Sequence, residues 1–327
     1  MKIWIDIDNS PHVNFVSPLI HRLRKDGHEV ILTTRRVFET AEMCDKYGLN
    51  AKVIGKHMGK NRLLKVSGYV YRLVVLYLWL PRFDVAFSLG GNTTSIVSSL
   101  RRNSKSISFS DNDISYKGVA FKLSNYFIVP KTFNIPENKN LKDKFIRFNG
   151  YKEEVYLDYL LSVSDSVEMP FEDYYVLRAE NLKANYVPLD SVTIVPELLG
   201  RLKKENIVFL PRYDSDKEYV QGYDNVFVPK GPVNGVRLVA NSKGVLTGAG
   251  TLAREAAMLG VPSVSFFPGT KLLSVDKNLF DEGRLFHSRD PEKIVEYIKS
   301  INQKSKSTGS QSDKFEVFYK QLIGAFQ

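Results

Sequence analysis

Residues 245–267 constrain the fold of this chain more than any other stretch. A short apolar run ends at Leu246, small residues follow at 248–251, a helical pattern covers 252–259, and a second apolar run covers 261–267. A strand, a tight loop, a helix and a second strand in this order form a βαβ unit, which requires a parallel sheet. Free N–H groups and the helix dipole would meet at the loop, so the segment also predicts an anion site.

Strand and helix patterns alternate along the rest of the chain. In the first half, strand patterns cover 2–7, 29–33, 51–54, 85–89, 106–109 and 127–129, and helical patterns cover 15–25, 38–47, 66–80 and 94–100. In the second half, strand patterns cover 174–177, 206–210, 226–228, 244–246 and 261–267, and helical patterns cover 192–202, interrupted near Pro196, and 234–240. This order predicts an α/β fold with two Rossmann-like, doubly wound domains facing across a cleft, with ligands at the carboxyl ends of the strands.

The predicted domains cover residues 1–150 and 151–300. Residues 131–150 are polar and contain Pro136, so they are a candidate connection between the domains. Residues 302–313 are poor in apolar side chains, which is typical of a flexible linker. Residues 315–326 then form a candidate terminal helix that packs back on the body of the protein.

Positive charge is concentrated in the first half. The chain carries 46 Lys and Arg against 36 Asp and Glu, and residues 1–150 hold 24 and 12 of these. This asymmetry predicts an anionic surface as a partner. Because no helix-turn-helix, zinc-finger or RNP-type pattern is found, nucleic acid is not the expected partner. A single cysteine, Cys44, and the absence of a signal-peptide pattern favour a cytoplasmic location.

Two interpretations are open for residues 68–80, GYVYRLVVLYLWL. The run is too short to cross a bilayer, which needs about 20 residues. Tyrosines, a tryptophan and basic side chains beside an apolar stretch are typical of an interfacial helix, here peripheral at the inner face of a membrane. The alternative is a crossover helix buried in the first domain. The basic residues in and around the run are Lys56, Lys60, Arg62, Lys65, Arg72 and Arg82.

The loop after the first strand holds a candidate general base. His12 follows Asn9 and Ser10 in the segment DIDNSPH at 6–12. Imidazole titrates near pH ~6.5, so His12 could accept a proton from a substrate hydroxyl at neutral pH. The alternative is that residues 8–10 only cap the first helix and that His12 is a surface residue.

Two further loops of the first half carry polar residues beyond strand patterns. Gly91, Asn92 and Thr93 lie in the small-residue loop at 90–95. Asp111 and Asp113 lie two residues apart after the strand pattern 106–109, where one could act as a base or orient an acceptor. A tight turn is the structural alternative for the first loop. We expect no metal ion, because too few oxygen ligands accompany the two aspartates.

In the second half, cationic side chains follow the strand patterns. Arg178 could clamp a diphosphate because its guanidinium is planar and always charged. Arg212 and Lys271 are further candidates for phosphate contacts, although the segment around Arg212 also fits a solvated loop. Glu255 lies one turn into the helical pattern 252–259, where its carboxylate could reach ribose hydroxyls.

The glycine loop resembles that of a known class of enzymes. The pattern G-x-G-T-x-x-x-E at 248–255, followed by Gly-Val-Pro at 260–262, is similar to the donor motif of GT-B nucleotide-sugar enzymes. The version it resembles most is that of non-hydrolysing UDP-N-acetylglucosamine 2-epimerases. The resemblance implies that the loop holds a nucleotide diphosphate and that the glutamate holds the ribose. The residues concerned are Gly248, Gly250, Thr251 and Glu255.

Three departures from the epimerases concern their catalytic groups. Asn92 stands where the epimerase loop G-D-T-T-S has its aspartate, and Leu177 stands where the motif H-R-R-E-N has its histidine. The epimerase segment E-A-G-L-R, which follows the strand at 106–109, is absent. The resemblance therefore extends to the architecture of the loops more than to epimerase chemistry.

Over residues 1–300 the chain resembles a prokaryotic family of predicted GT-B proteins known as a domain of unknown function. The shared segments are WIDIDNSPHV at 4–13, FNGYKEEVYL at 148–157 and FFPG at 266–269. This resemblance implies the fold and not the activity. Our first hypothesis is a cofactor-free glycosyltransferase with an acceptor domain at 1–150, where His12 or Asp111 is the base, and a nucleotide-sugar domain at 151–300. On this hypothesis the acceptor is lipid-linked or an envelope glycan. A nucleotide-sugar 2-epimerase and a non-catalytic GT-B binding protein are the alternatives.

Overall fold

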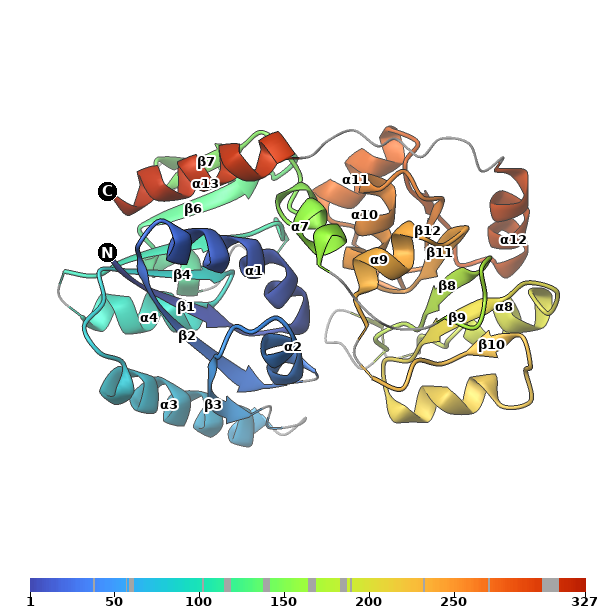
Figure 1. Ribbon diagram of the computed structural model, residues 1–327, viewed down its shortest axis with the longest axis horizontal. Helices are drawn as coiled ribbons and strands as arrows, with labels where there is room; N and C mark the ends of the chain where they lie inside the picture. The colour runs from blue at the N-terminus through green and yellow to red at the C-terminus, as the bar shows by residue number, and fades with distance from the viewer. Residues whose placement is uncertain are drawn as a thin grey trace. The chain divides into compact units, whose positions relative to one another are not determined.

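The computed structural model describes residues 1–327 apart from 38, 57, 59–61, 102, 115–118, 138–141, 164–168, 183–186, 189, 232, 270 and 302–311. The chain divides into two compact units. The first comprises Met1–Tyr156 together with Gln311–Gln327, and the second comprises Leu157–Ser310. Figure 1 shows helices and strands interleaved within each of them.

The first unit is built on a seven-stranded sheet with the order β3-β2-β1-β4-β5-β6-β7. All of its strand pairs are parallel. The strands are β1 (Lys2–Ile7), β2 (Glu29–Arg36), β3 (Lys52–Lys56), β4 (Val85–Leu89), β5 (Lys105–Phe109), β6 (Tyr126–Pro130) and β7 (Phe145–Phe148). The strand order reverses between β1 and β4, so the loops after these two strands open side by side at the topological switch point.

Within the described residues, α-helices and a short 3-10 helix accompany this sheet. They are α1 (Ser10–Lys25), α2 (Thr40–Lys46), α3 (Arg62–Trp79), α4 (Asn92–Leu100), α5 (Val119–Leu123), η1 (Glu153–Val155) and α13 (Ser312–Phe326). The last helix completes the core of the unit, because the buried ring of Phe318 lies 5.3 Å from that of Phe15, 5.6 Å from Phe109 and 5.4 Å from Phe148.

The second unit repeats the plan with six parallel strands in the order β10-β9-β8-β11-β12-β13. The strands are β8 (Tyr175–Arg178), β9 (Ile207–Leu210), β10 (Val226–Phe227), β11 (Gly244–Thr247), β12 (Ser263–Ser265) and β13 (Phe286–His287). The helices are α7 (Leu157–Ser162), α8 (Val195–Arg201), η2 (Asp214–Val220), α9 (Gly235–Ala240), α10 (Gly250–Met258), α11 (Ser274–Asp281) and α12 (Pro291–Ser300). Its switch point lies between β8 and β11.

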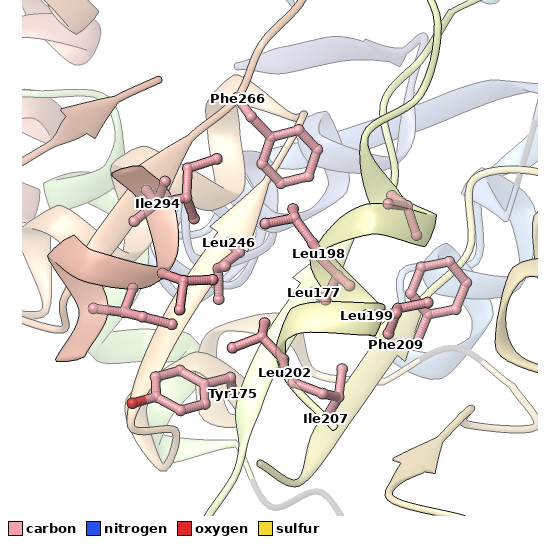
Figure 2. Close-up of a cluster of buried hydrophobic side chains, with 14 of the residues drawn as sticks. Tyr175, Leu177, Leu198, Leu199, Leu202, Ile207, Phe209, Leu246, Phe266 and Ile294 are labelled. Carbon is pink, nitrogen blue, oxygen red and sulfur yellow. The ribbon is translucent and has the colours of Figure 1, made fainter. Parts of the chain in front are cut away.

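One face of the second sheet is covered by α8 and α12. Figure 2 shows Leu177, Phe209 and Leu246 of the strands pointing toward the helical layer. That layer contributes Leu198 and Leu199 of α8, Leu202 at the C-cap of α8, and Ile294 of α12. These side chains are almost wholly buried. Burying a large aliphatic or aromatic side chain contributes roughly 1.5–3 kcal/mol, so this cluster is a major source of stability for the unit.

Two parallel sheets with interleaved helices confirm the predicted doubly wound α/β architecture. Residues 131–150 are not simply a connection, because β7 lies within them and pairs with β6, where Phe145 packs against Phe127 and Phe133. Pro196 does not interrupt a helix; it lies in the first turn of α8, where a missing N–H costs nothing. Of the predicted linker at 302–313, residues 302–311 lie outside the described part.

Candidate functional site

The predicted donor-binding residues gather at the switch point of the second sheet. Thr247 at the end of β11 pairs in register with Arg178 at the end of β8. The N–H group of Gly248 donates to the carbonyl oxygen of Arg178 at 3.1 Å. The half-buried Arg178, which is the last residue of β8, therefore lies directly beside the loop that precedes α10. This is the crevice in which doubly wound sheets bind their ligands.

Gly248 allows the two strand ends to approach closely. A Cβ atom at this position would lie 2.4 Å from Cγ and 2.7 Å from Cα of Glu180, which no side chain could accommodate without a backbone shift. Glu180 is itself buried and accepts hydrogen bonds from Thr193 Oγ1 at 2.8 Å and from the N–H of Ile194 at 3.1 Å. The buried Glu180 therefore packs closely against Gly248 in the loop before α10.

Helix α10 begins at this loop without a side-chain cap. Its N-cap residue is Ala249, and its first turn contains no acidic residue. Beneath the first turn lies Arg254, which is 4% exposed, pairs with Asp276 Oδ1 at 3.0 Å and approaches Thr251 Oγ1 at 3.4 Å. Backbone amides and the helix dipole therefore create a positive potential at this point, which suits a phosphate group, whereas the charge of Arg254 is paired with Asp276.

The other predicted residues of this half lie on α10 or after the neighbouring strands. Glu255 is buried on α10. Arg212 is half-buried one strand away, beyond β9, and its N–H donates to Asp216 at 2.7 Å. Tyr213 beside it donates from its hydroxyl to Asn181 Oδ1 at 2.6 Å. Lys271 is exposed beyond β12. The structure thus brings Arg178 together with Gly248, Gly250 and Thr251, whereas Arg212 and Lys271 follow the strands next to this pair.

In the first unit, a lysine joins two of the predicted catalytic residues. Lys152 Nζ lies 2.6 Å from Asp111 Oδ2, which follows β5, and the lysine is almost wholly buried. His12 lies in the first turn of α1 and interacts electrostatically with both groups. Asp113, two residues beyond Asp111, is half-buried. The structure therefore assembles His12, Asp111 and Lys152 into one cluster.

The imidazole of His12 is held in its neutral form. Its Nδ1 atom is buried and has no hydrogen-bond partner among the residues that the structure describes. Burial, reinforced by the positive charge of Lys152, lowers the pKa of His12 to about 4. At neutral pH the ring can accept a proton, and an anion placed against Lys152 would make that proton easier to hold.

The remaining polar residues of these loops bind to the protein itself. Asn9 caps α1 by accepting from the N–H of Ser10 at 3.0 Å, and the Ser10 hydroxyl lies 3.3 Å from that of Thr40. Asn92 accepts from the N–H of Ala120 at 2.8 Å. The capping alternative thus applies to Asn9, and Asn92 connects α4 to α5.

The loop after β4 packs against a buried charge network. Thr93 is buried and accepts from Arg72 Nη1 at 3.1 Å. A Cβ at Gly91 would lie 3.3 Å from Asp8 Oδ2, so this glycine keeps the loop close to β1. Arg72 reaches from α3 and makes a two-pronged ion pair with Asp6, with distances of 2.7 and 3.0 Å.

Sequence reasoning did not assign roles to Lys152 or Arg254, and it counted Arg72 among the basic residues of a candidate interfacial helix, whereas the structure buries Arg72 against Asp6. A signal existed for Lys152, since it lies in the segment 148–157 on which the family resemblance rests. Arg72 was the one charged residue within the apolar run 68–80. Its partner Asp6 is 66 residues away in the sequence. Neither the Lys152–Asp111 pair nor the Arg72–Asp6 pair follows from the local sequence pattern, because partners so far apart in the sequence meet only in the folded protein.

The whole chain matches one family profile, and one curated relative is similar to it. The profile is described as "Protein of unknown function (DUF354)" and matches residues 1–327. The relative, "Uncharacterized protein MJ0665" of Methanocaldococcus jannaschii, is 28% identical over 324 residues, which cover 91% of each protein.

Solved structures of nucleotide-sugar enzymes share the fold. The UDP-GlcNAc 2-epimerase of M. jannaschii, in complex with UDP-GlcNAc and UDP, has a TM-score of 0.68 at 15% identity over 99% of this chain and all of that one. The MnaA–UDP structure from S. aureus has a TM-score of 0.74 at 11% identity over 98% and 95% of the two chains. The glycotransferase of kitacinnamycin has a TM-score of 0.61 at 13% identity over 99% and 98%. At these identities the likeness establishes the fold alone, which is the GT-B fold.

Proposed function

The chain belongs to the DUF354 family, and from this premise and its GT-B fold we propose that it is a glycosyltransferase that uses a nucleotide-diphosphate sugar. The observation that carries the proposal is the uncapped start of α10 at the switch point of the second sheet, with Arg178 at the end of the adjacent strand. A diphosphate is the ligand that matches this concentration of N–H groups and positive charge.

The donor would bind entirely to the second unit. The first-turn N–H groups at Gly250 and Thr251 and the guanidinium of Arg178 would hold the diphosphate, while Glu255 would accept from the ribose hydroxyls. Arg212 and Lys271 would add positive charge from the neighbouring loops. The similar structures from M. jannaschii and S. aureus are complexes that contain UDP, which supports a nucleotide diphosphate as the first candidate.

The first unit would supply the acceptor side of the reaction. The acceptor hydroxyl attacks the anomeric carbon, the bond from that carbon to the diphosphate oxygen breaks, and the hydroxyl proton passes to His12. The Asp111–Lys152 pair would orient the acceptor beside the imidazole. The departing diphosphate would be stabilised by the N–H groups of α10 and by Arg178, because negative charge develops there in the transition state.

We extend this proposal to the acceptor and its place in the cell. A lipid-linked or envelope glycan is the proposed acceptor, handled by a cytoplasmic protein that works at the inner face of the membrane. The excess of positive charge in residues 1–150 supports this, because the cytoplasmic leaflet is anionic.

A 2-epimerase is the second candidate, since several of the similar structures, among them the M. jannaschii complex with UDP-GlcNAc and UDP, are 2-epimerases. Against it, Leu177 occupies the position of the epimerase histidine and is wholly buried in the apolar cluster of Figure 2. Incubating the protein with UDP-GlcNAc alone separates the candidates. Formation of the 2-epimer without an acceptor would favour the epimerase and contradict the transferase.

Donor binding is tested by titrating the protein with UDP, GDP, CDP and dTDP in a calorimeter. We expect one of them to bind, and Thr251→Asp to weaken that binding by about tenfold or more, because a carboxylate in the first turn of α10 repels the diphosphate. The same charge favours the helix start, so the variant should remain folded. Ser300→Asp, at the exposed end of α12, is the matched control and should bind as the wild type does. Equal affinity in wild type and Thr251→Asp would contradict the assignment.

A further inference from the structure

Helix α3 has its apolar and charged sides in the reverse of the usual arrangement. Arg72, in the middle of the helix, is 3% exposed and faces the sheet. It pairs with Asp6, donates from Nε to the carbonyl of Ile54 at 2.8 Å and donates to Thr93. Leu76 on the same side packs in a cluster with Trp4. The inner side of α3 is therefore fixed by a charge network and a small apolar cluster.

The opposite side of α3 is apolar and faces outward. Its residues recur every three or four positions, so they lie on one side of the helix. We call this side the outer face of α3; it consists chiefly of Leu63, Val66, Val70, Tyr71, Val74 and Leu78, which are between 52% and 80% exposed. A continuous apolar surface of this kind is rare on a soluble monomer and marks a site of interaction.

The charge around the outer face of α3 indicates what kind of partner binds there. Residues 46–83 contain eight Lys and Arg and no Asp or Glu. Of these, Arg72 is neutralised within the protein, whereas Lys52 and Lys56 of the neighbouring strand β3 and Arg82 beyond the helix are exposed. Figure 1 shows α3 beside β3, at the margin of the first unit. An apolar strip with basic residues at its borders matches a surface that is apolar inside and anionic outside.

We propose that α3 is an interfacial helix whose outer face inserts into an anionic lipid bilayer. Its 18 residues span about 27 Å and would lie in the plane of the membrane. No helix within the described ranges has the length and apolar character needed to cross a bilayer. Trp79 and Tyr77 at the end of the helix suit the boundary between lipid and water. A second copy of this chain fits less well, since it would bring two acid-free basic borders together.

This inference does not depend on the proposed glycosyl transfer, because lipid binding is measured without donor or acceptor. Of the two tryptophans, Trp4 is wholly buried and Trp79 is 43% exposed. The first experiment adds vesicles of phosphatidylglycerol and phosphatidylcholine to the full-length protein. We expect co-sedimentation, a blue shift of the Trp79 emission and weaker binding in high salt. Vesicles of phosphatidylcholine alone should bind less protein.

A pair of matched variants tests the face itself. Val74→Glu places a charge at the centre of the outer face, and we expect vesicle affinity to fall by about tenfold or more. Val192→Glu introduces the same change at another exposed valine, in the second unit, and should bind vesicles as the wild type does. Val74→Ser removes apolar contact without adding charge and should lose part of the affinity. Both Val74 variants should keep the wild-type melting temperature, because the side chain faces outward.

Three results would overturn the proposal. The wild type could fail to bind anionic vesicles, or Val74→Glu and Val74→Ser could bind them as well as the wild type. In the third case, the wild type would be a dimer, Val74→Glu would be a monomer, and neither protein would bind vesicles. That result would assign the outer face of α3 to a second copy of the chain.

Discussion

The Lys152 side chain controls the charge around His12. Its ammonium group pairs with Asp111 and acts on the imidazole, which burial already keeps neutral. Asp111 acts on the ring in the opposite direction, raising its pKa. The lysine therefore opposes protonation of His12 both directly and by pairing with the aspartate that would favour it.

We expect Lys152→Met to raise the pKa of His12 from about 4 toward its ordinary value near 6.5. The pKa should remain below 6.5, since burial is the larger cause and stays in place. Histidine ring resonances followed by NMR against pH measure this directly. Lys122→Met, which removes an exposed lysine from the same unit, is the control and should leave the titration unchanged.

The same shift predicts how stability depends on pH. The pKa of folded His12 lies below that of the unfolded chain, so the unfolded state binds a proton first as the pH falls. Neutral His12 therefore contributes to the free energy of unfolding in full above pH 6.5. This contribution decreases as the pH falls to 4, by at most about 3 kcal/mol. Urea unfolding at pH 7 and pH 5 measures this loss of unfolding free energy. We expect the loss between the two pH values to be smaller in Lys152→Met than in the wild type. An equal decline in both proteins would show that Lys152 does not act on His12.

At the scale of elements, α3 is held to the first sheet by a buried ion pair. Arg72 of α3 and Asp6 of β1 are almost wholly buried and joined by two hydrogen bonds. Thr33 of β2 donates to Asp6 at 2.5 Å, and Trp4 donates to Thr33 at 2.8 Å. The network thus connects one helix to two strands, beside the switch point where the predicted acceptor loops open.

Removing one member of this pair should be costly, because it leaves an uncompensated buried charge. We expect Arg72→Leu to lower the free energy of unfolding by about 3–5 kcal/mol. The double variant Asp6→Leu/Arg72→Leu should recover a large part of that loss, because neither charge remains. Arg82→Leu, which removes an exposed arginine nearby, should change stability by less than about 0.5 kcal/mol. Urea unfolding of the four proteins measures the coupling, and a double variant no better than Arg72→Leu would contradict it.

The sequence located α3 but not its orientation. The apolar run 66–80 predicts a helix, and the structure has one at Arg62–Trp79. Apolar residues lie on nearly every side of it, so periodicity does not identify the side that packs. From the sequence alone, Arg72 cannot be told apart from the basic residues that flank the run. Only its contact with Asp6 shows that it lies on the side of α3 that packs against the sheet. That contact depends on how β1 and α3 meet in space, which local sequence does not encode.

At the scale of the molecule, alternation of strand and helix patterns was sufficient to predict two doubly wound units. The glycine loop at 248–251 also located the candidate donor crevice, since its position after β11 follows from the local pattern. The sequence could not show that the second unit is inserted between parts of the first. Helix α13 follows the second unit in the chain but belongs to the core of the first, where Phe318 meets aromatic rings from α1, β5 and β7.

This connectivity predicts that a change at the end of the chain destabilises its beginning. Phe318→Ala removes a wholly buried ring, so we expect the first unit to lose about 3–5 kcal/mol of stability. Scanning calorimetry should then resolve two transitions, of which only the first unit's moves to lower temperature. If the donor site is as proposed, UDP should raise only the second unit's transition and so identify it. Val317→Ala, at an exposed neighbour on α13, is the control and should move neither. A single transition that shifts as a whole would instead show that the two units unfold together, in which case α13 stabilises both.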